Sequence, residues 1–360
     1  MELKKDSYAI MKTITLTIGI PTYNRPQALE RRLNEIKKFH NLIDEVVICD
    51  NSPQILPSLA QAVQELSKCH YYKNSGNIGG GANFLRVVEH AKSDYVWWRG
   101  DDDVISENQI QSVHAYLSTT PRLILLSTNV KAPFIGKGIK TFVENFPVVR
   151  TFGWLSAIVL PTQFAQKSLR WGYFGIASGW ANVALILGLF REYPDLEFVV
   201  VPISLQDGEF RDVDRKEGLR WSLFRTCIKQ FPLTAQVLES EQLRKIYLAK
   251  WRTTHGFHWI KTMVRFKLGY MPQEKITLAT FFPFISIRNL RTTILAIILW
   301  IMANIPRLAY QLTFAYIWFY LDDKTKQKLE LDFLSGCENY WQVFKALRVN
   351  KGYVSTDGFI

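Results

Sequence analysis

Three consecutive carboxylates, Asp101, Asp102 and Asp103, closely follow the apolar segment 95–98. Adjacent like charges repel each other, and burying them costs several kcal/mol unless a cation lies nearby. Hard cations such as Mg²⁺ and Mn²⁺ prefer oxygen ligands, usually one or two carboxylates together with substrate phosphates. The triplet therefore predicts a metal–diphosphate site. Taken alone it is equally compatible with an acidic cap on the following helix, because helix N-termini also favour acids.

The segment 13–127 alternates between short apolar or β-branched runs and segments with apolar residues at helical spacing. Strands are expected at 13–20, 45–49, 69–72, 95–98 and 123–127. Four helices are expected between them, and their apolar residues are Leu29, Leu33 and Ile36, then Leu59, Val63 and Leu66, then Phe84, Val87 and Val88, and finally Ile110, Val113 and Leu117. Repeated β–α units with nearly continuous apolar strands predict an α/β fold with a mostly parallel sheet covered on both faces.

The ends of the expected strands carry the polar residues. Pro21–Arg25, Asp50–Ser52 and Asp101–Asp103 each follow a strand. The carboxyl ends of parallel strands form the edge at which open α/β sheets bind their ligands. We therefore expect these three segments to meet in one crevice, although about thirty and fifty residues separate them in sequence. This convergence favours the metal site over the helix cap.

Four motifs in the same order resemble the landmarks of the inverting family 2 glycosyltransferases. They are Ile20-Pro21-Thr22-Tyr23-Asn24-Arg25, Val46-Val47-Ile48-Cys49-Asp50-Asn51-Ser52, Asn77-Ile78-Gly79-Gly80-Gly81-Ala82-Asn83 and Gly100-Asp101-Asp102-Asp103. The Gly-Asp-Asp-Asp form also resembles a subgroup, the abequosyltransferase-like enzymes of bacterial O-antigen synthesis. The resemblance covers the chain up to about residue 130. It implies the GT-A (Rossmann-like) fold and a nucleotide-sugar donor.

The resemblance also implies roles for individual residues. The turn that contains Pro21, Thr22, Tyr23, Asn24 and Arg25 is similar to the segment that lies over the nucleotide base. Asp50 stands where the family accepts a hydrogen bond from the base, and Asn83 matches a frequent asparagine of the following helix. The acidic triplet takes the place of the Asp-x-Asp motif, with Asp101 on the ribose and Asp102 and Asp103 on the metal.

This constellation suits sugar transfer on chemical grounds as well. A sugar that leaves a nucleoside diphosphate needs its departing phosphates neutralised, which Mn²⁺ or Mg²⁺ held by carboxylates can do. A base must also take the proton from the attacking acceptor hydroxyl. The resemblance implies inversion at the anomeric carbon by one direct displacement.

The catalytic base has no obvious position. Family members often carry an acidic pair or a lone Asp before a helix in the middle of the chain, where this chain has Ser178-Gly179-Trp180-Ala181-Asn182-Val183 without a carboxylate. Asp207 and Glu209 are the nearest downstream acids after a strand expected at 197–203, so they are the base candidates, with Asp195 a further choice. The aromatic stretch 171–180 either lines an acceptor pocket or packs as core.

Composition limits the possible partners and compartment. The net charge of +12 suits an anionic partner, but no nucleic-acid-binding fold signature is present, so nucleic acid is not expected. The four cysteines are scattered without a Cys-x-x-Cys pair, which favours a reducing compartment. The charged N-terminus has no apolar signal segment. We therefore expect the catalytic half to lie on the cytoplasmic side.

The second half predicts contact with a membrane. Residues 241–275 contain eight Lys or Arg and only two Glu, interleaved with aromatic residues, which is typical of a helix on an anionic lipid surface. The apolar run 292–305 falls short of the roughly 20 residues of a simple span. A second apolar run covers 308–321. Monotopic or peripheral attachment to the inner face of the cell membrane is therefore favoured over a span or a soluble interface.

Together these features predict a GT-A domain over 11–235, a basic, aromatic and α-helical membrane-associating region over 236–325, and a tail over 326–360. The expected function is metal-dependent inverting glycosyl transfer from a nucleotide-sugar to a lipid-diphosphate-linked saccharide, in cell-surface polysaccharide synthesis. Two other functions stay open: a catalytically weak nucleotide-binding scaffold on a transferase fold, and a nucleotidyltransferase.

Overall fold

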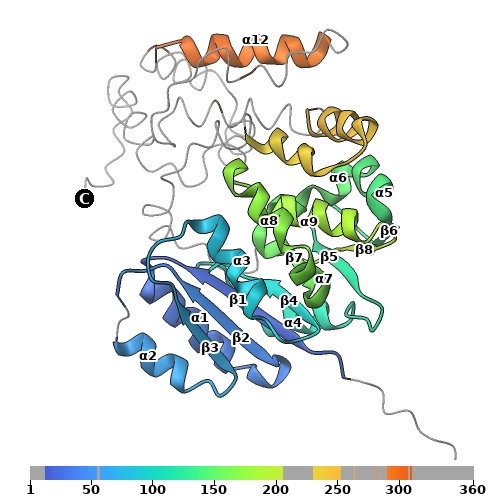
Figure 1. Ribbon diagram of the computed structural model, residues 1–360. Helices are drawn as coiled ribbons and strands as arrows, with labels where there is room; N and C mark the ends of the chain where they lie inside the picture. Colours follow the sequence, from blue (N-terminus) through green and yellow to red (C-terminus); the bar gives the residue numbers. More distant parts are fainter. Residues whose placement is uncertain are drawn as a thin grey trace, which may run out of the picture. The chain divides into compact units, whose positions relative to one another are not determined.

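A computed structural model describes residues 13–54, 57–205, 230–252 and 290–306, together with positions 263, 281 and 309. The chain divides into two compact units, Met1–Phe210 with Leu233–Tyr247 and Arg211–Pro232 with Leu248–Ile360. The first unit contains the predicted strand edge, and Figure 1 shows its sheet with helices on both faces.

An eight-stranded mixed sheet forms the centre of the first unit, in the order β3-β2-β1-β4-β7-β5-β8-β6. Its strands are β1 (Leu16–Thr22), β2 (Glu45–Asp50), β3 (Cys69–Lys73), β4 (Tyr95–Trp98), β5 (Arg122–Leu126), β6 (Phe134–Lys137), β7 (Ile158–Pro161) and β8 (Glu197–Val201). The first four run parallel, so their carboxyl ends share one edge. The 3-2-1-4 order places a topological switch point between β1 and β4, where open α/β sheets bind ligands.

Helices cover both faces of the parallel half. They are α1 (Pro26–Lys37), α2 (Pro57–Gln64), α3 (Gly80–His90) and α4 (Glu107–His114). Side chains alternate along a strand, so Leu16, Ile18 and Ile20 of β1 enter one core cluster with apolar residues of α1 and α4. Gly19 of β1 faces the other way, toward Val87 of α3.

Further helices of the first unit follow β6 and β7. They are α5 (Gly138–Glu144), α6 (Phe146–Val149), α7 (Thr162–Lys167), α8 (Leu169–Phe174) and α9 (Ala181–Glu192), with short 3₁₀ turns η1 (His40–Leu42), η2 (Arg150–Gly153), η3 (Leu155–Ala157) and η4 (Gly175–Ser178). Residues 181–190 of α9 are all buried, so this helix is an internal support.

The expected strands and helices of segment 13–127 are confirmed, and so is the mostly parallel sheet. One feature was not predicted. β7 pairs antiparallel with both β4 and β5 and separates them, whereas simple β–α repetition would place β5 beside β4. Two short 3₁₀ turns, η2 and η3, precede β7 in the chain.

Outside the sheet, the structure describes η7 (Phe231–Val237), a helical segment over 241–252 and the helix α12 (Leu290–Asn304). Several large apolar side chains of α12 are exposed, namely Ile294, Ile297, Ile298, Trp300 and Ile301. No helix in the described part of the chain is long and apolar enough to cross a membrane. The apolar run expected at 308–321 lies outside the described residues, apart from position 309.

The close approach of α3 to β1 leads to a prediction. A Cβ atom at position 19 would lie 2.1 Å from Cγ1 of Val87, so Gly19→Ala must displace the helix or its side chain. Overpacking of this kind typically costs about 1–3 kcal/mol, and we expect thermal unfolding to begin several degrees lower. Gly76→Ala is the matched control, because nothing lies within 4 Å of its added Cβ. Equal melting temperatures for both variants would contradict this packing.

Candidate active site

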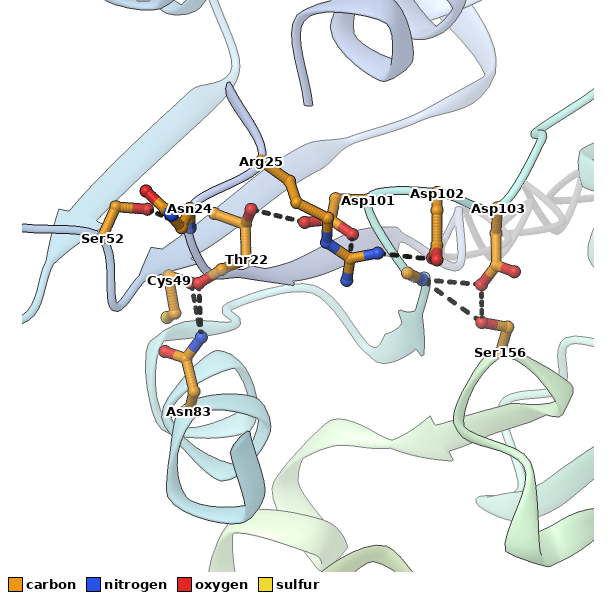
Figure 2. A network of polar contacts seen from close by, with 11 residues as sticks. Thr22, Asn24, Arg25, Cys49, Ser52, Asn83, Asp101, Asp102, Asp103 and Ser156 are labelled. Atoms are coloured by element: carbon orange, nitrogen blue, oxygen red, sulfur yellow. Dashed lines mark hydrogen bonds and ion pairs between the residues drawn. The ribbon is translucent and has the colours of Figure 1, made fainter. Parts of the chain in front are cut away.

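The ends of β1, β2 and β4 line one cleft of about 510 Å³. Its walls come from the 21–25 turn, the glycine-rich loop (residues 74–81), the acidic loop after β4 (residues 100–103) and the segment 154–156. The lining residues are Pro21, Thr22, Tyr23, Arg25, Asn51, Asn77, Gly79, Gly80, Asn83, Phe84, Gly100, Asp102, Asp103, Trp154, Leu155 and Ser156. The predicted convergence of the strand ends is therefore confirmed. Figure 2 shows polar contacts among the turn after β1, the end of β2, Asn83 of α3, the acidic loop and Ser156.

Asp101 is the buried anchor of the acidic loop. Its side chain is 0% exposed, and its carboxylate accepts a 2.5 Å hydrogen bond from the Thr22 hydroxyl. Arg25 places one guanidinium nitrogen 2.7 Å from Asp101 and another 2.7 Å from Asp102 (Figure 2). Burial raises the pKa of Asp101 to about 7, while Arg25 and Thr22 act in the opposite direction. Arg25 thus provides the positive charge that the triplet requires.

Asp102 and Asp103 face the cleft in different ways. Asp102 is the more accessible, with its side chain 36% exposed and Arg25 as its partner. Asp103 folds back on its own loop and accepts hydrogen bonds from the backbone N–H of Gly100 at 2.8 Å and from the hydroxyl of Ser156. Gly100 also donates to Ser156 Oγ at 3.2 Å. The segment before β7 therefore holds the acidic loop in position.

The turn after β1 is held in an unusual backbone conformation. Asn24 has a φ of 56°, a left-handed conformation that Asn tolerates better than most residues. Its N–H donates to Ser52 Oγ at 2.7 Å, which links the ends of β1 and β2. The Tyr23 side chain is 49% exposed beside the cleft, so its ring is accessible to a ligand.

Asp50 and Asn83 lie deeper than the exposed cleft residues. Asp50 is 1% exposed and accepts hydrogen bonds from Ser52 N–H at 2.7 Å and from the Tyr71 hydroxyl. Asn83 donates to the carbonyl oxygens of Thr22 and Cys49, at 3.1 and 2.9 Å, and so ties β1 to β2 (Figure 2). The base-binding role of Asp50 stays a prediction.

A second set of amides joins the glycine-rich loop to the same edge. Asn74 donates to the side-chain oxygens of both Asn51 and Asn83, each at 2.8 Å. Asn51 in turn donates to Asn77 Oδ1 and to the Gly79 carbonyl. Asn51 and Asn77 line the cleft but were not singled out from the sequence, although both lie inside quoted motifs. The asparagine amides in these motifs are the feature of the sequence that could have indicated a hydrogen-bonded loop beside the end of β2.

The donor set fits a divalent cation that is only partly coordinated by protein. Asp102 and Asp103 both line the cleft, and carboxylate oxygen is the ligand that Mg²⁺ and Mn²⁺ prefer. No group of three or more His, Cys, Asp or Glu side chains arranged for a metal is found within the described residues. One or two carboxylates completed by substrate phosphates and water are the usual arrangement for such ions.

Arg99 precedes the acidic loop but does not line the cleft. Its backbone N–H donates to Gly19 at 2.8 Å, its side chain donates to the Val104 carbonyl, and its guanidinium lies 4.8 Å from the ring centre of Trp97. Burial lowers the pKa of Arg99 to about 10, and Asp103 opposes this shift. Arg99 therefore supports the acidic loop from its buried side.

Of the two alternatives for the aromatic stretch 171–180, the contacts of Trp171 agree with packing. Trp171 contacts Glu192 through its indole N–H and packs against Arg170 and Arg191, and it does not line the cleft. Trp154 and Ser156 line it instead, and sequence reasoning missed both because they lie more than fifty residues from the acidic triplet. The base candidates Asp207 and Glu209 lie outside the described residues.

The Ser156 contacts lead to a prediction. Ser156→Ala leaves Asp103 and the Gly100 N–H without their shared hydroxyl, which typically costs about 1–3 kcal/mol for buried polar groups. We expect a lower urea midpoint and weaker Mn²⁺ binding by calorimetry. Ser168→Ala is the matched control, since Ser168 is also buried but its hydroxyl has no partner in the described part of the chain. Unchanged stability and Mn²⁺ affinity in Ser156→Ala would exclude the positioning role.

Comparison with known proteins agrees with the motifs. Residues 17–146 match the model of Glycosyl transferase family 2. The chain is 33% identical over 122 residues to abequosyltransferase RfbV of Salmonella typhimurium, which covers 31% of this chain and 34% of that protein. It is 30% identical over 108 residues to the uncharacterized glycosyltransferase MG060 of Mycoplasma genitalium, covering 28% and 36%. Each match thus spans about a third of the relative.

Solved structures resemble the chain more distantly. The crystal structure of S. aureus TarS 1–349 has a TM-score of 0.46 and 14% identity, covering 95% of this chain and 93% of that one. The mannosyltransferase PcManGT of Pyrobaculum calidifontis, in complex with GDP-Man and Mn²⁺, has a TM-score of 0.44 and 12% identity, covering 92% and 88%. The family match confirms the resemblance that the four motifs predicted: residues 17–146 carry a glycosyltransferase family 2 domain.

Proposed function

We propose that the protein is a metal-dependent, inverting glycosyltransferase that uses a nucleoside-diphosphate sugar as donor and a lipid-diphosphate-linked saccharide as acceptor. The observation that carries the donor part is the common cleft at the ends of β1, β2 and β4, which brings Tyr23, Arg25 and the acidic loop together. The family 2 match over residues 17–146 supports the reaction class.

The cleft offers groups that suit the base and the diphosphate of such a donor. Tyr23 offers an exposed ring for the base at one wall. Arg25 and the glycine-rich loop line the same cleft as the acidic loop, and they offer a cation and backbone groups to an anionic diphosphate. Asp101 is fully buried, and its contacts with Thr22 and Arg25 hold the acidic loop in place.

Asp102 and Asp103 are the residues that would hold Mn²⁺ or Mg²⁺. When bound, such an ion neutralises the departing diphosphate and acts as a Lewis acid. Arg25 must share or release Asp102 for the carboxylate to serve as a ligand, because it occupies Asp102 Oδ2 at 2.7 Å. We place the acceptor base at Asp207 or Glu209, with inversion by one direct displacement.

The acceptor side of the proposal rests on the second half of the chain. The helical segment 241–252 carries Arg244, Lys245, Lys250 and Arg252, and basic side chains attract anionic lipid. The exposed side chains Ile294, Ile297, Ile298 and Ile301 form one stripe at helical spacing along α12. Together they support peripheral or monotopic docking on the inner face of the cell membrane, where a lipid-linked saccharide in cell-surface polysaccharide synthesis, such as an O-antigen, is accessible.

A second candidate function is a nucleotide-binding scaffold without strong turnover. It is favoured by the buried, uncharged sequence Ala181-Asn182-Val183, where family members often carry an acid. Nucleotide binding without transfer to any acceptor would support it. Turnover of nucleoside triphosphates with release of pyrophosphate would instead indicate a nucleotidyltransferase.

The metal assignment predicts the effect of Asp102→Asn. This change removes the accessible carboxylate while keeping its shape, so we expect transfer with Mn²⁺ or Mg²⁺ to fall roughly 100-fold, as for the loss of one electrostatic group at a transition state. Donor turnover and Mn²⁺ binding should be measured on the same samples.

The matched control for Asp102→Asn is Glu65→Gln. Glu65 is also a partly exposed carboxylate with a cationic partner, Lys37 at 2.8 Å, but it does not line the cleft. We expect its transfer rate to equal that of the unchanged protein. Undiminished transfer in Asp102→Asn would refute the metal assignment.

The membrane assignment predicts the effect of the double change Ile297→Glu and Ile301→Glu. Both side chains are about half exposed on α12, so two carboxylates there would oppose insertion into an anionic surface. We expect loss of flotation with phosphatidylcholine–phosphatidylglycerol vesicles. Ile135→Glu, an exposed isoleucine of β6, is the control and should still float. Equal flotation of all three proteins would argue against docking through α12.

A further inference from the structure

Trp154 is an exposed indole in the wall of the cleft. Its side chain is 42% exposed, whereas Trp97 and Trp98, which precede the acidic loop, are fully buried. Trp154 lines the cleft together with Leu155 and Ser156. Exposing a large apolar ring to water carries a cost that a bound ligand can relieve.

The backbone that carries Trp154 is held firmly. Its N–H donates to the Thr151 carbonyl at 2.8 Å, and its carbonyl accepts from Ala157 at 3.0 Å. The preceding residue, Gly153, packs against the Trp180 ring, since a Cβ at position 153 would lie 3.4 Å from it. Asn182 donates to the Gly153 carbonyl at 3.3 Å. The indole is therefore carried by a backbone segment that hydrogen bonds hold on both sides.

The position of Trp154 relates it to the transferred sugar. Ser156, two residues on, bonds to the Asp103 carboxylate, so the Trp154 wall meets the acidic loop directly. Tyr23 belongs to the turn after β1, which contacts the other end of the acidic triplet. In that turn Arg25 pairs with Asp101 and Asp102. In a nucleoside-diphosphate sugar the diphosphate lies between the base and the sugar. If the base lies at Tyr23 and the diphosphate at the acidic loop, the sugar extends toward Trp154.

We infer that Trp154 stacks on the apolar face of the donor sugar and selects the nucleotide-sugar over the bare nucleoside diphosphate. The inference rests on the proposed donor function. The C–H groups on one face of a pyranose form a flat, weakly polar surface, and a rigid indole covers such a surface at low entropic cost. Hydroxyl groups at the ring edge remain free to bond with other polar groups of the cleft.

Calorimetry tests the inference by comparing bare and sugar-loaded nucleotides. UDP, GDP, CDP and dTDP are titrated with Mn²⁺, each beside its glucose and mannose conjugates, against the whole protein. In the unchanged protein we expect at least one conjugate to bind more tightly than its nucleoside diphosphate. In Trp154→Ala this gain should be lost, by about tenfold for a stacked ring, while the affinity for the bare diphosphate is retained. Trp154→Phe should keep part of the gain, because a phenyl ring can still stack.

Phe174→Ala is the matched control, since Phe174 is 54% exposed but does not line the cleft, and it should preserve the full gain. Retained affinity of Trp154→Ala for the bare diphosphate shows that this variant is folded. An equal gain in Trp154→Ala and in the unchanged protein, or no gain for any conjugate in the unchanged protein, would overturn the inference alone. Failure of every nucleoside diphosphate to bind the unchanged protein would instead overturn the proposed donor function.

Discussion

The neutralisation of Asp101 is the constraint on which the site depends. A carboxylate with no exposed surface is tolerated only with a close cation and hydrogen-bond donors, and Asp101 has Arg25 and Thr22. The pairing of Gly19 with Trp98 in β1 and β4 brings Thr22, three residues beyond Gly19, beside Asp101, three beyond Trp98. The pairing of Asp101 with Thr22 and Arg25 therefore depends on the register of β1 and β4. A shift of that register by one residue would leave the buried Asp101 carboxylate without these partners.

The parallel half of the fold and the meeting of its strand ends were predictable from the sequence, because both depend on local patterns. Continuous apolar strands indicate burial on both faces, and burial of that kind indicates parallel β–α units. The insertion of β7 between β4 and β5 was not predictable. Four apolar residues, Ile158–Pro161, give no strand direction, and their pairing is decided by tertiary contacts such as that of the Trp97 indole with the Ser156 carbonyl.

The same distinction applies to the polar residues of the site. Motifs identified the turn at Pro21–Arg25 and the triplet, since their chemistry is visible in the residue types alone. They did not show that Arg25 pairs with two of the three aspartates, or that Ser156 holds the third, because hydrogen-bond partners far apart in sequence follow from the folded path of the chain. Aromatic content likewise drew attention to 171–180, whereas the exposed ring beside the acidic loop is Trp154.

Asn182 lies in the segment Ser178–Val183, which contains no carboxylate, and its side chain has a structural role. Its side-chain N–H₂ donates to the carbonyl oxygens of Phe152 and Gly153, at 3.2 and 3.3 Å, and the residue is only 5% exposed. An ionised aspartate has no proton to donate and would face two carbonyl dipoles in a buried setting, which is electrostatically unfavourable. Position 182 thus supports the backbone that carries Trp154 and Ser156. For the proposed transferase, we therefore expect the acceptor's base to come from another segment of the chain.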